Sequence, residues 1–250
     1  MDLGIEGRTA LVMGASQGIG RGVAASLARE GARVAIASRS GERLEQAGRE
    51  IEGEVVPFVA DANDLDRLAG LPAEVAEALS PIEILVTNTG GPRLGRALEH
   101  PADEWEAAYR TLVLAPRTLV DAVLPGMRER HWGRIANVAS SSVREPIPGL
   151  ALSNAHRMAA VGLFKTLAAE VAGDGITVNT VATGRFATQR AADNAGSLQA
   201  AEERARKDVP AGRLGTPEEY GDLVAFLCSE RASYLTGAVI PLDGGLLRSA

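Results

Sequence analysis

The chain has few of the residues that define several protein classes. With one cysteine, Cys228, in 250 residues it can form neither an internal disulfide nor a thiol metal site, so we expect no metal. Its 26 Lys and Arg against 32 Asp and Glu give a net charge of −6, which argues against nucleic acid as a partner. No apolar run reaches the roughly 18 residues of a membrane span. The first residues also do not resemble a secretory leader, so we expect a cytoplasmic protein without membrane contact.

Short runs rich in β-branched residues alternate with longer helical segments. The predicted strands are residues 9–13, 33–37, 55–59, 82–87, 134–138, 177–181 and 238–241. The predicted helices are residues 19–30, 41–51, 64–79, 102–129, 151–172 and 217–228. This alternation is typical of parallel sheets with helices on both faces. We therefore predict, over residues 1–250, a single-domain α/β fold: a Rossmann-type, doubly wound sheet of about seven parallel strands.

The alternation fails over residues 183–215, which follow the sixth predicted strand. Ligands of open α/β sheets bind beyond the carboxyl ends of the strands, so this stretch is a candidate substrate lid. An ordinary surface insertion is the alternative.

A glycine-rich turn follows the first predicted strand. From Gly14 to Gly20 it reads Gly-Ala-Ser-Gln-Gly-Ile-Gly and leads into a helical segment. In such a turn, backbone N–H groups and a helix N-terminus face a pyrophosphate, and the missing side chains let the phosphates approach. The strand–turn–helix setting favours dinucleotide binding over a plain tight turn.

Later segments extend this pattern. They are Asp61, Asn88-Thr89-Gly90, Asn137-Val138-Ala139-Ser140, Asn179-Thr180-Val181-Ala182-Thr183-Gly184 and Asp243-Gly244-Gly245. With the Gly-x-x-x-Gly-x-Gly spacing, nearly the whole chain resembles the short-chain dehydrogenase/reductase family, and within it the 3-oxoacyl-acyl-carrier-protein reductases. The resemblance implies an oxidoreductase acting on a carbonyl or alcohol, with a small molecule or a 3-oxoacyl thioester as substrate. It also implies a homodimer or homotetramer formed through residues 151–172 and the helix beginning at Ala102.

The resemblance assigns a set of cofactor-binding residues. They are Gly14, Ser16, Gln17, Gly18, Ile19, Gly20, Ser38, Arg39, Asp61, Ala62, Asn88, Gly90, Arg157, Gly184 and Thr188. Asp61 would accept a hydrogen bond from the adenine amino group, and Asn88 and Gly90 would line the adenosine-ribose and nicotinamide side. Plainer roles stay open, because Asp61 can begin a helix and Asn88 and Gly90 can form a turn.

The end of the second predicted strand bears on the choice of cofactor. A carboxylate there favours NAD, whereas an arginine accommodates the 2′-phosphate of NADP. This chain has Ser38-Arg39, and a guanidinium can pair with a phosphate bidentately, so we predict NADP(H) over NAD(H). Gln17 stands where relatives that prefer NADP often carry a base, which argues the other way, and Arg39 can also be a solvated surface residue.

The catalytic positions depart from the family. Its usual centre is an Asn, a Ser, and a Tyr followed four residues later by a Lys. Residues 162–168 align without a gap and fix the register, in which the Ser is Ser140, the Tyr position is Ser153, the Lys position is Arg157 and the Asn position is Leu112. We predict Ser140, Ser153 and Arg157 as the catalytic residues of a modified centre.

These replacements change the chemistry. A phenol, with a pKa near 10, can be tuned by a nearby cation, whereas an aliphatic hydroxyl such as that of Ser153 cannot. Arg157 stays protonated, so it can bind ribose hydroxyls or an anion but cannot relay a proton. His156 is a candidate substitute acid, or else a partly exposed or interface histidine on a helix. Five arginines either meet an anionic substrate or are simply solvated: Arg93, Arg96, Arg144, Arg185 and Arg190.

Three function classes remain open. The first is an NADP(H)-dependent oxidoreductase with a modified active site. The second is a nucleotide-binding pseudoenzyme with a partner-binding or sensing role, which the missing Tyr and Lys favour. The third, a structural protein that binds no nucleotide, fits poorly with an intact glycine turn.

Overall fold

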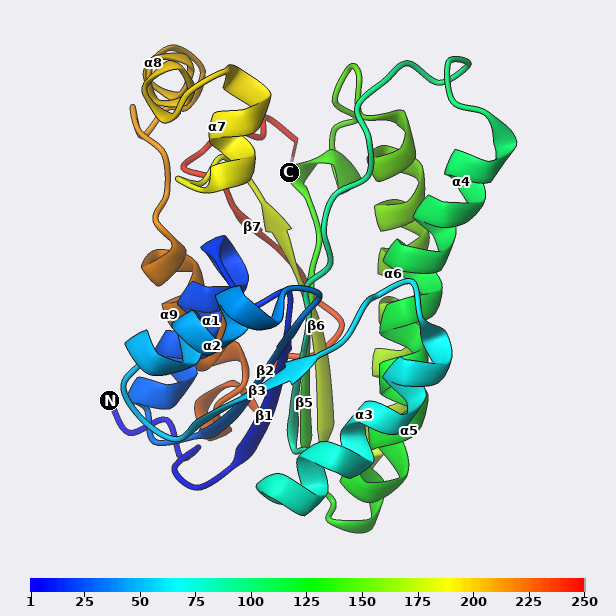
Figure 1. Ribbon diagram of the computed structural model, residues 1–250, viewed down its shortest axis with the longest axis vertical. Helices are drawn as coiled ribbons and strands as arrows, with labels where there is room; N and C mark the ends of the chain where they lie inside the picture. The colour runs from blue at the N-terminus through cyan, green and yellow to red at the C-terminus, as the bar shows by residue number, and fades with distance from the viewer. Residues whose placement is uncertain (250) are drawn as a thin grey trace.

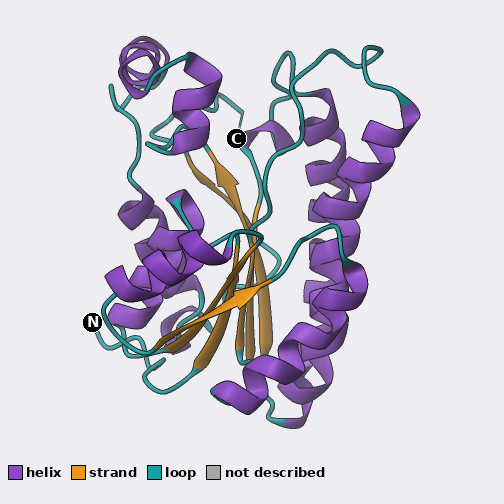
Figure 2. Ribbon diagram, viewed as in Figure 1, coloured by secondary structure: helices purple, strands orange, loops and turns teal. Residues whose placement is uncertain are grey.

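Seven parallel strands form the centre of the computed structural model, which describes residues 1–249 (Figures 1 and 2). They are β1 (Thr9–Met13), β2 (Arg33–Ser38), β3 (Val55–Val59), β4 (Ile84–Thr87), β5 (Gly133–Val138), β6 (Ile176–Thr183) and β7 (Val239–Leu242). Their order in the sheet is β3-β2-β1-β4-β5-β6-β7. Because the winding reverses between β1 and β4, this is a doubly wound, Rossmann-type sheet, and the predicted fold class is confirmed.

Helices cover both faces of the sheet, and Figure 1 shows the two groups on opposite sides. One face carries α1 (Gly18–Arg29), α2 (Gly41–Glu50) and α9 (Pro217–Leu227), and the other carries α3 (Leu65–Ala78), α4 (Ala102–Tyr109), α5 (Ala115–Glu129) and α6 (Ala151–Val171). Short 3-10 helices lie at Ser141–Val143, Ala172–Asp174 and Glu230–Ala232. None of the helices in residues 1–249 is both long enough and apolar enough to span a membrane.

The inner strands β1 and β4 are nearly continuous apolar runs because both of their faces are buried. In β1, Ala10 and Val12 pack into one core cluster, while Leu11 and Met13 pack into the other. All five residues of β1 are buried. The alternation of side chains along the strand thus divides the core into two layers, one under each group of helices.

Helices α1 and α9 pack closely because each presents a glycine at their contact. A Cβ on Gly22 would lie 2.2 Å from the carbonyl oxygen of Pro217, and one on Gly221 would lie 2.4 Å from that of Gly22. Only glycine permits this approach, which fixes α1 and the turn that precedes it.

The predicted helix over residues 102–129 is divided into three parts. A π-helical segment, Arg110–Leu114, separates α4 from α5. Pro116 at the start of α5 has no N–H to donate to the carbonyl of Leu112, four residues earlier, so the regular helical ladder is interrupted here. The helical spacing of the apolar residues continues through this segment, so the sequence pattern predicted one uninterrupted helix.

Two further helices, α7 (Gln189–Ala195) and α8 (Leu198–Asp208), lie within residues 183–215, where the sequence predicted none. Thr188 and Ser197 cap them by accepting hydrogen bonds from the backbone N–H groups of Ala191 (3.2 Å) and Ala200 (3.1 Å). This stretch also has a small apolar core of its own, formed by Ala201, Ala205, Val209 and Leu214.

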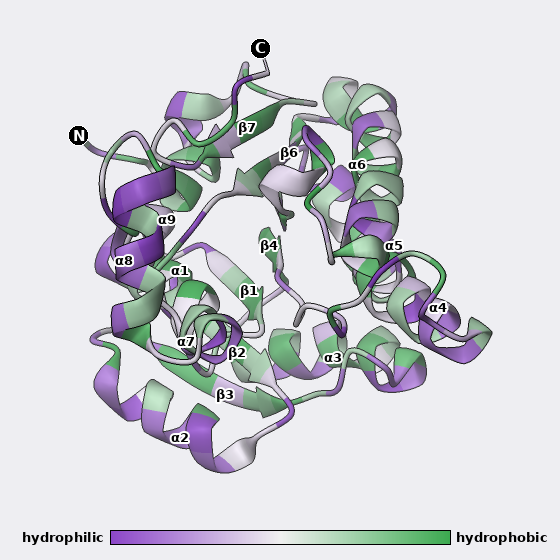
Figure 3. Ribbon diagram, turned by 90° about the horizontal axis from the view of Figure 1, so that it is seen from above, coloured by the Kyte–Doolittle hydropathy of each residue, from purple (hydrophilic) through white to green (hydrophobic). Residues whose placement is uncertain are grey.

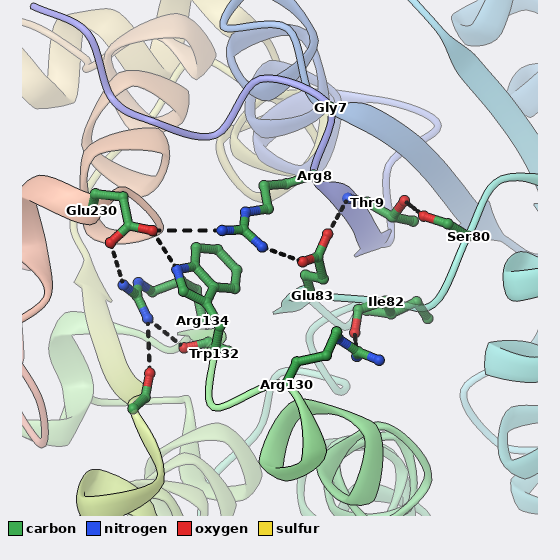
Figure 4. Close-up of polar contacts among 12 residues, drawn as sticks. Gly7, Arg8, Thr9, Ser80, Ile82, Glu83, Arg130, Trp132, Arg134 and Glu230 are labelled. Atoms are coloured by element: carbon green, nitrogen blue, oxygen red, sulfur yellow. Dashed lines mark hydrogen bonds and ion pairs between the residues drawn. The ribbon is translucent and has the colours of Figure 1, made fainter.

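Trp132 organises the amino-terminal edge of the sheet (Figure 4). The guanidinium carbons of Arg8 and Arg134 lie 4.1 and 4.3 Å from the centre of its ring system. The indole N–H donates to Glu230 over 2.5 Å, and Arg134, which is buried, lies 3.5 Å from the same carboxylate. Arg8 in turn pairs with Glu83. The cluster joins the starts of β1, β4 and β5 to the segment after α9.

We therefore expect Trp132→Ala to lower the free energy of unfolding by about 3–5 kcal/mol, because it removes a buried ring together with its contacts. Trp132→Phe keeps most of the ring surface and should cost distinctly less. Urea denaturation of the three proteins measures this, and a loss below about 1 kcal/mol for Trp132→Ala would contradict the role given to the ring.

Candidate functional site

A cleft of about 1630 Å³ lies at the carboxyl ends of the strands, beyond β1 to β6. It is lined by the predicted catalytic residues Ser140, Ser153 and Arg157. It is also lined by Gly14, Ser16, Gln17, Gly18, Ile19, Ser38, Arg39, Asp61, Ala62, Asn88, Gly90, Gly184 and Thr188. Gly20 is the one predicted site residue that does not line it.

The glycine turn depends on positions where no side chain fits. Gly14 and Gly18 have φ values of +61° and +56°, in the left-handed region that favours glycine. A Cβ on Gly20 would lie 2.3 Å from the carbonyl oxygen of Gly14 and 2.7 Å from the amide nitrogen of Asn88. Gly20 therefore holds the turn against α1 and Asn88, rather than facing the cleft as predicted.

The N-terminus of α1 opens onto the cleft. Its N-cap residue, Gln17, makes no side-chain capping hydrogen bond. The first backbone N–H groups of the helix thus remain available, beside the positive end of the helix dipole. The Asn88 side chain donates to the carbonyl of Gly14 over 3.3 Å and ties the end of β4 to this turn. The arrangement suits a bound phosphate group.

The ends of β2 and β3 form the adjoining part of the cleft. The Ser38 hydroxyl is buried without a hydrogen-bond partner, and Arg39 is exposed and makes no ion pair within residues 1–249. Asp61 accepts from the backbone N–H and the side-chain amide of Asn63, over 2.9 and 3.0 Å. The cap of α3 is Asp64, so Asp61 precedes the helix and does not cap it.

The predicted catalytic residues come together from β5 and α6. Ser140 follows β5, and its side chain accepts from the backbone N–H of Ser142 over 3.1 Å. Arg157 donates to the carbonyl of Val138 over 2.7 Å. Burial lowers the pKa of Arg157 to about 10, so the guanidinium is charged at neutral pH. Leu112, from the π-helical segment, lines the same cleft and brings no polar group.

His156 does not replace the missing phenol. Its Nδ1 lies 2.8 Å from the carbonyl oxygen of Leu152, and its ring packs against Trp105 and Tyr109 at centroid distances of 5.4 and 6.2 Å. It is buried between α4 and α6 and does not line the cleft. His156 is therefore a packed core residue, and neither the substitute acid nor the partly exposed helix histidine that the sequence offered.

Tyr220 of α9 is a residue that sequence reasoning missed. Its hydroxyl lies 2.9 Å from that of Thr183, which lines the cleft, and its side chain is fully buried. Burial raises the pKa of Tyr220, so the phenol stays protonated and is a poor proton donor. No local motif marks this pair, because the two residues are far apart in the sequence.

The five arginines considered for an anionic substrate all have protein partners. Arg93 donates to Glu104 (2.5 Å), Arg96 lies near Glu99 (3.9 Å), and Arg185 pairs with Asp208 (2.8 Å). Arg144 donates to the carbonyl of Val239 (3.2 Å), and Arg190 donates to those of Gly91 (3.2 Å) and Pro92 (3.0 Å). Arg93 and Arg96 keep 69% and 85% of their side chains exposed, as expected of solvated residues, whereas Arg190 joins α7 to the loop after β4.

The described residues hold no group of three or more His, Cys, Asp or Glu side chains placed to bind a metal ion. Cys228 is buried, and burial raises the pKa of its thiol to about 12.

A doubly wound parallel sheet with a glycine turn at its reversal point defines a Rossmann-type α/β protein. A family model described as Enoyl-(Acyl carrier protein) reductase matches residues 14–247. The chain belongs to the short-chain dehydrogenase/reductase family, as the sequence predicted.

Known proteins resemble the chain over its whole length. The 3-oxoacyl-[acyl-carrier-protein] reductase FabG of Thermotoga maritima is 33% identical over 246 residues, which are 97% of this chain and 99% of that protein. The structure of L-sorbose reductase from Gluconobacter frateurii with NADPH and L-sorbose has a TM-score of 0.95 and 30% identity, with all of both chains covered. An actinorhodin polyketide ketoreductase variant with NADPH has a TM-score of 0.91 and 32% identity, covering 96% of this chain and 97% of that one.

The geometry of the turn predicts the effect of a single methyl group. We expect Gly20→Ala to raise the dissociation constant for NADPH at least about tenfold, a cost of about 1.4 kcal/mol, because the new Cβ displaces the Gly14 carbonyl. Gly70→Ala on α3 is the matched control, since a Cβ there meets nothing within 4 Å. Calorimetric titration measures both, and an unchanged constant in folded Gly20→Ala would contradict the role of this contact.

Proposed function

We propose that this protein is an NADP(H)-dependent oxidoreductase that acts on a carbonyl or alcohol substrate through a modified catalytic centre. The observation that carries the proposal is the uncapped glycine turn, which opens into the same cleft as Ser140 and Arg157. The substrate is a small molecule or an acyl thioester such as a 3-oxoacyl thioester. Residues 183–215, whose α7 lies at the cleft, would serve as its lid.

The residues of the cleft fit a nicotinamide dinucleotide. The α1 N-terminus and the turn would hold the pyrophosphate, and the unpartnered Ser38 hydroxyl and unpaired Arg39 would meet the adenosine ribose and its 2′-phosphate. NADPH in the L-sorbose reductase and in the ketoreductase supports the preference for NADP(H). Asp61 and Ala62 would then adjoin the adenine, with Asn88, Gly90, Gly184 and Thr188 along the rest of the cofactor.

A bound nicotinamide supplies or accepts the hydride. The Ser140 hydroxyl would donate a hydrogen bond to the substrate oxygen, and the Arg157 cation would stabilise negative charge that develops there or hold the nicotinamide ribose. Ser153 has an aliphatic hydroxyl, so it would pass on a proton from water rather than act as the acid. With Leu112 in place of an amide, this centre would move protons slowly compared with its relatives.

The alternative is a nucleotide-binding pseudoenzyme, and one observation favours it. Neither His156, packed away from the cleft, nor Tyr220, with its raised pKa, supplies the acid that Ser153 lacks. Measuring NADPH oxidation with a panel of 3-oxoacyl thioesters and ketones separates the two functions. Turnover supports the oxidoreductase, whereas micromolar NADPH binding without turnover supports the pseudoenzyme.

For the oxidoreductase we expect Ser140→Ala to lower kcat about 10²–10³-fold, as loss of one donor to a developing oxyanion does, with little change in the NADPH dissociation constant. Steady-state kinetics and calorimetry test this together. An unchanged kcat in Ser140→Ala would show that the Ser140 hydroxyl takes no part in the reaction.

Cofactor preference should depend on Arg39. We expect Arg39→Asp to shift the ratio of NADPH to NADH dissociation constants about 10- to 100-fold toward NADH, because a charged hydrogen bond of about 1.5–3 kcal/mol becomes a repulsion. Arg39→Lys keeps the charge without the bidentate geometry and should give an intermediate ratio. Titration of both cofactors into the three proteins is the measurement, and an unchanged ratio would rule out this assignment.

We also propose a homodimer or homotetramer. Ala155, Met158, Ala159 and Gly162 lie exposed along α6, and Figure 3 colours much of this helix on the apolar side of the scale. Small side chains permit close helix packing between copies, and mass measurement in solution tests it.

A further inference from the structure

The last residues of the chain return to the mouth of the cleft. We call residues 246–249 the tail. In Figure 1 the last described segment, in red, runs between α7 and the segment that follows β5. Leu246 and Leu247 line the cleft. Residues from the far end of the sequence therefore form part of the wall around the candidate active site.

Two carboxylates hold the tail, and one of them, Glu145, comes from the loop between β5 and α6. Glu145 Oε1 accepts hydrogen bonds from the backbone N–H groups of Arg248 (2.9 Å) and Ser249 (2.6 Å). These bonds lower the pKa of Glu145, so the side chain is ionised at neutral pH. The other carboxylate, Asp243, accepts from the N–H groups of Gly245 (2.9 Å), in the preceding turn, and Leu247 (2.8 Å), in the tail.

The tail also contacts the segment that contains α7 and α8. Leu246 packs against the apolar core of that segment, in which Val209 and Leu214 are buried. The backbone N–H of Ala211 donates to the carbonyl of Gly244 over 3.0 Å. The tail thus bridges the loop after β5, through Glu145, and the segment over the cleft.

The tail adds to a wall of the cleft that contains aliphatic side chains, where the loop after β4 pairs with the segment before α6 through Gly95 and Leu150. Its other aliphatic members come from the loop after β4 and from the start of α6 and the loop before it: Leu94, Ile147, Leu150 and Leu152. Leu94 is 44% exposed, more than a packed core residue would be. Leu150, the N-cap of α6, stands three residues before Ser153, so this wall leads toward the proposed reacting centre.

We propose that Glu145 is a positioning residue: it holds the tail as one side of an apolar wall that binds an alkyl chain attached to the substrate carbonyl. The inference rests on the proposed function and narrows its substrate to a carbonyl compound with an apolar chain, in contrast to a polyhydroxylated sugar. Glu145 acts through Leu246 and Leu247 and does not touch the reacting atoms.

The first arm of the test needs no turnover. Hydrogen exchange of the C-terminal peptide, followed by mass spectrometry, is compared in wild type, Glu145→Ala and Glu145→Gln, with Glu129→Ala as the control for an exposed carboxylate outside the cleft. We expect exchange at least tenfold faster in Glu145→Ala, a smaller change in Glu145→Gln, which keeps an acceptor oxygen, and no change in Glu129→Ala. Equal exchange in wild type and Glu145→Ala would overturn the proposal.

The second arm measures the wall itself with primary alkyl amides of increasing chain length, whose carbonyl is not reduced. In wild type bound to NADPH, affinity should rise about threefold to fourfold per added methylene. In Glu145→Ala that dependence should flatten, with the NADPH dissociation constant unchanged. The same dependence in both proteins, or none in wild type, would overturn the proposal.

The two arms distinguish this inference from the proposed function. A protein that binds the amides in this graded way but does not bind NADPH would disprove the cofactor assignment and leave the wall in place. Normal NADPH binding with ketone turnover that does not depend on chain length would disprove the wall and leave the cofactor assignment in place.

Discussion

The close approach of Gly20 to the carbonyl of Gly14 and to Asn88 is the contact on which the cleft depends. It bends the chain directly from β1 into α1 and leaves the first N–H groups of that helix uncapped at the carboxyl edge of the sheet. A second pair of glycines, Gly22 and Gly221, then fixes α1 against α9. The positive end of the α1 dipole points toward the cleft because Gly14, Gly20, Gly22 and Gly221 have no side chains that would prevent these contacts. Because the sheet reverses its winding between β1 and β4, the loops after these two strands lead to helices on opposite faces.

The proposed reaction depends on a centre in which, by the resemblance, Ser140, Ser153 and Arg157 stand at the family's Ser, Tyr and Lys positions. Ser140 lies where the family places its serine, but Ser153 lacks the acidity of a phenol and Arg157 holds its proton at neutral pH. The surroundings do not compensate: Leu112 is apolar, His156 faces α4, and the buried Tyr220 resists ionisation. Arg157 remains suited to stabilising negative charge. The proposed reaction therefore relies on electrostatic stabilisation by a fixed cation more than on proton transfer by a side chain.

Much of this structure could be predicted from local patterns, and the rest could not for identifiable reasons. The limits of β1 match prediction because a strand buried in a parallel sheet is a short apolar run between polar loops, and those of β3 match although this edge strand is only partly buried. The glycine turn could be predicted because all of its residues lie within one short, contiguous segment of the sequence. The π-helical segment follows from Pro116, whose missing N–H acts on Leu112 within an otherwise regular helical pattern. The pairing of Tyr220 with Thr183 and of Glu145 with the tail joins distant parts of the chain, and no single-sequence pattern marks such contacts.

A crystal structure of the protein with NADPH bound tests the central claim most directly. We expect the pyrophosphate to lie at the N-terminus of α1 and the 2′-phosphate to contact Arg39. The nicotinamide should lie in the part of the cleft formed by Ser140 and Arg157. A cofactor bound elsewhere, or a nicotinamide held away from Ser140 by the replaced side chains, would contradict it.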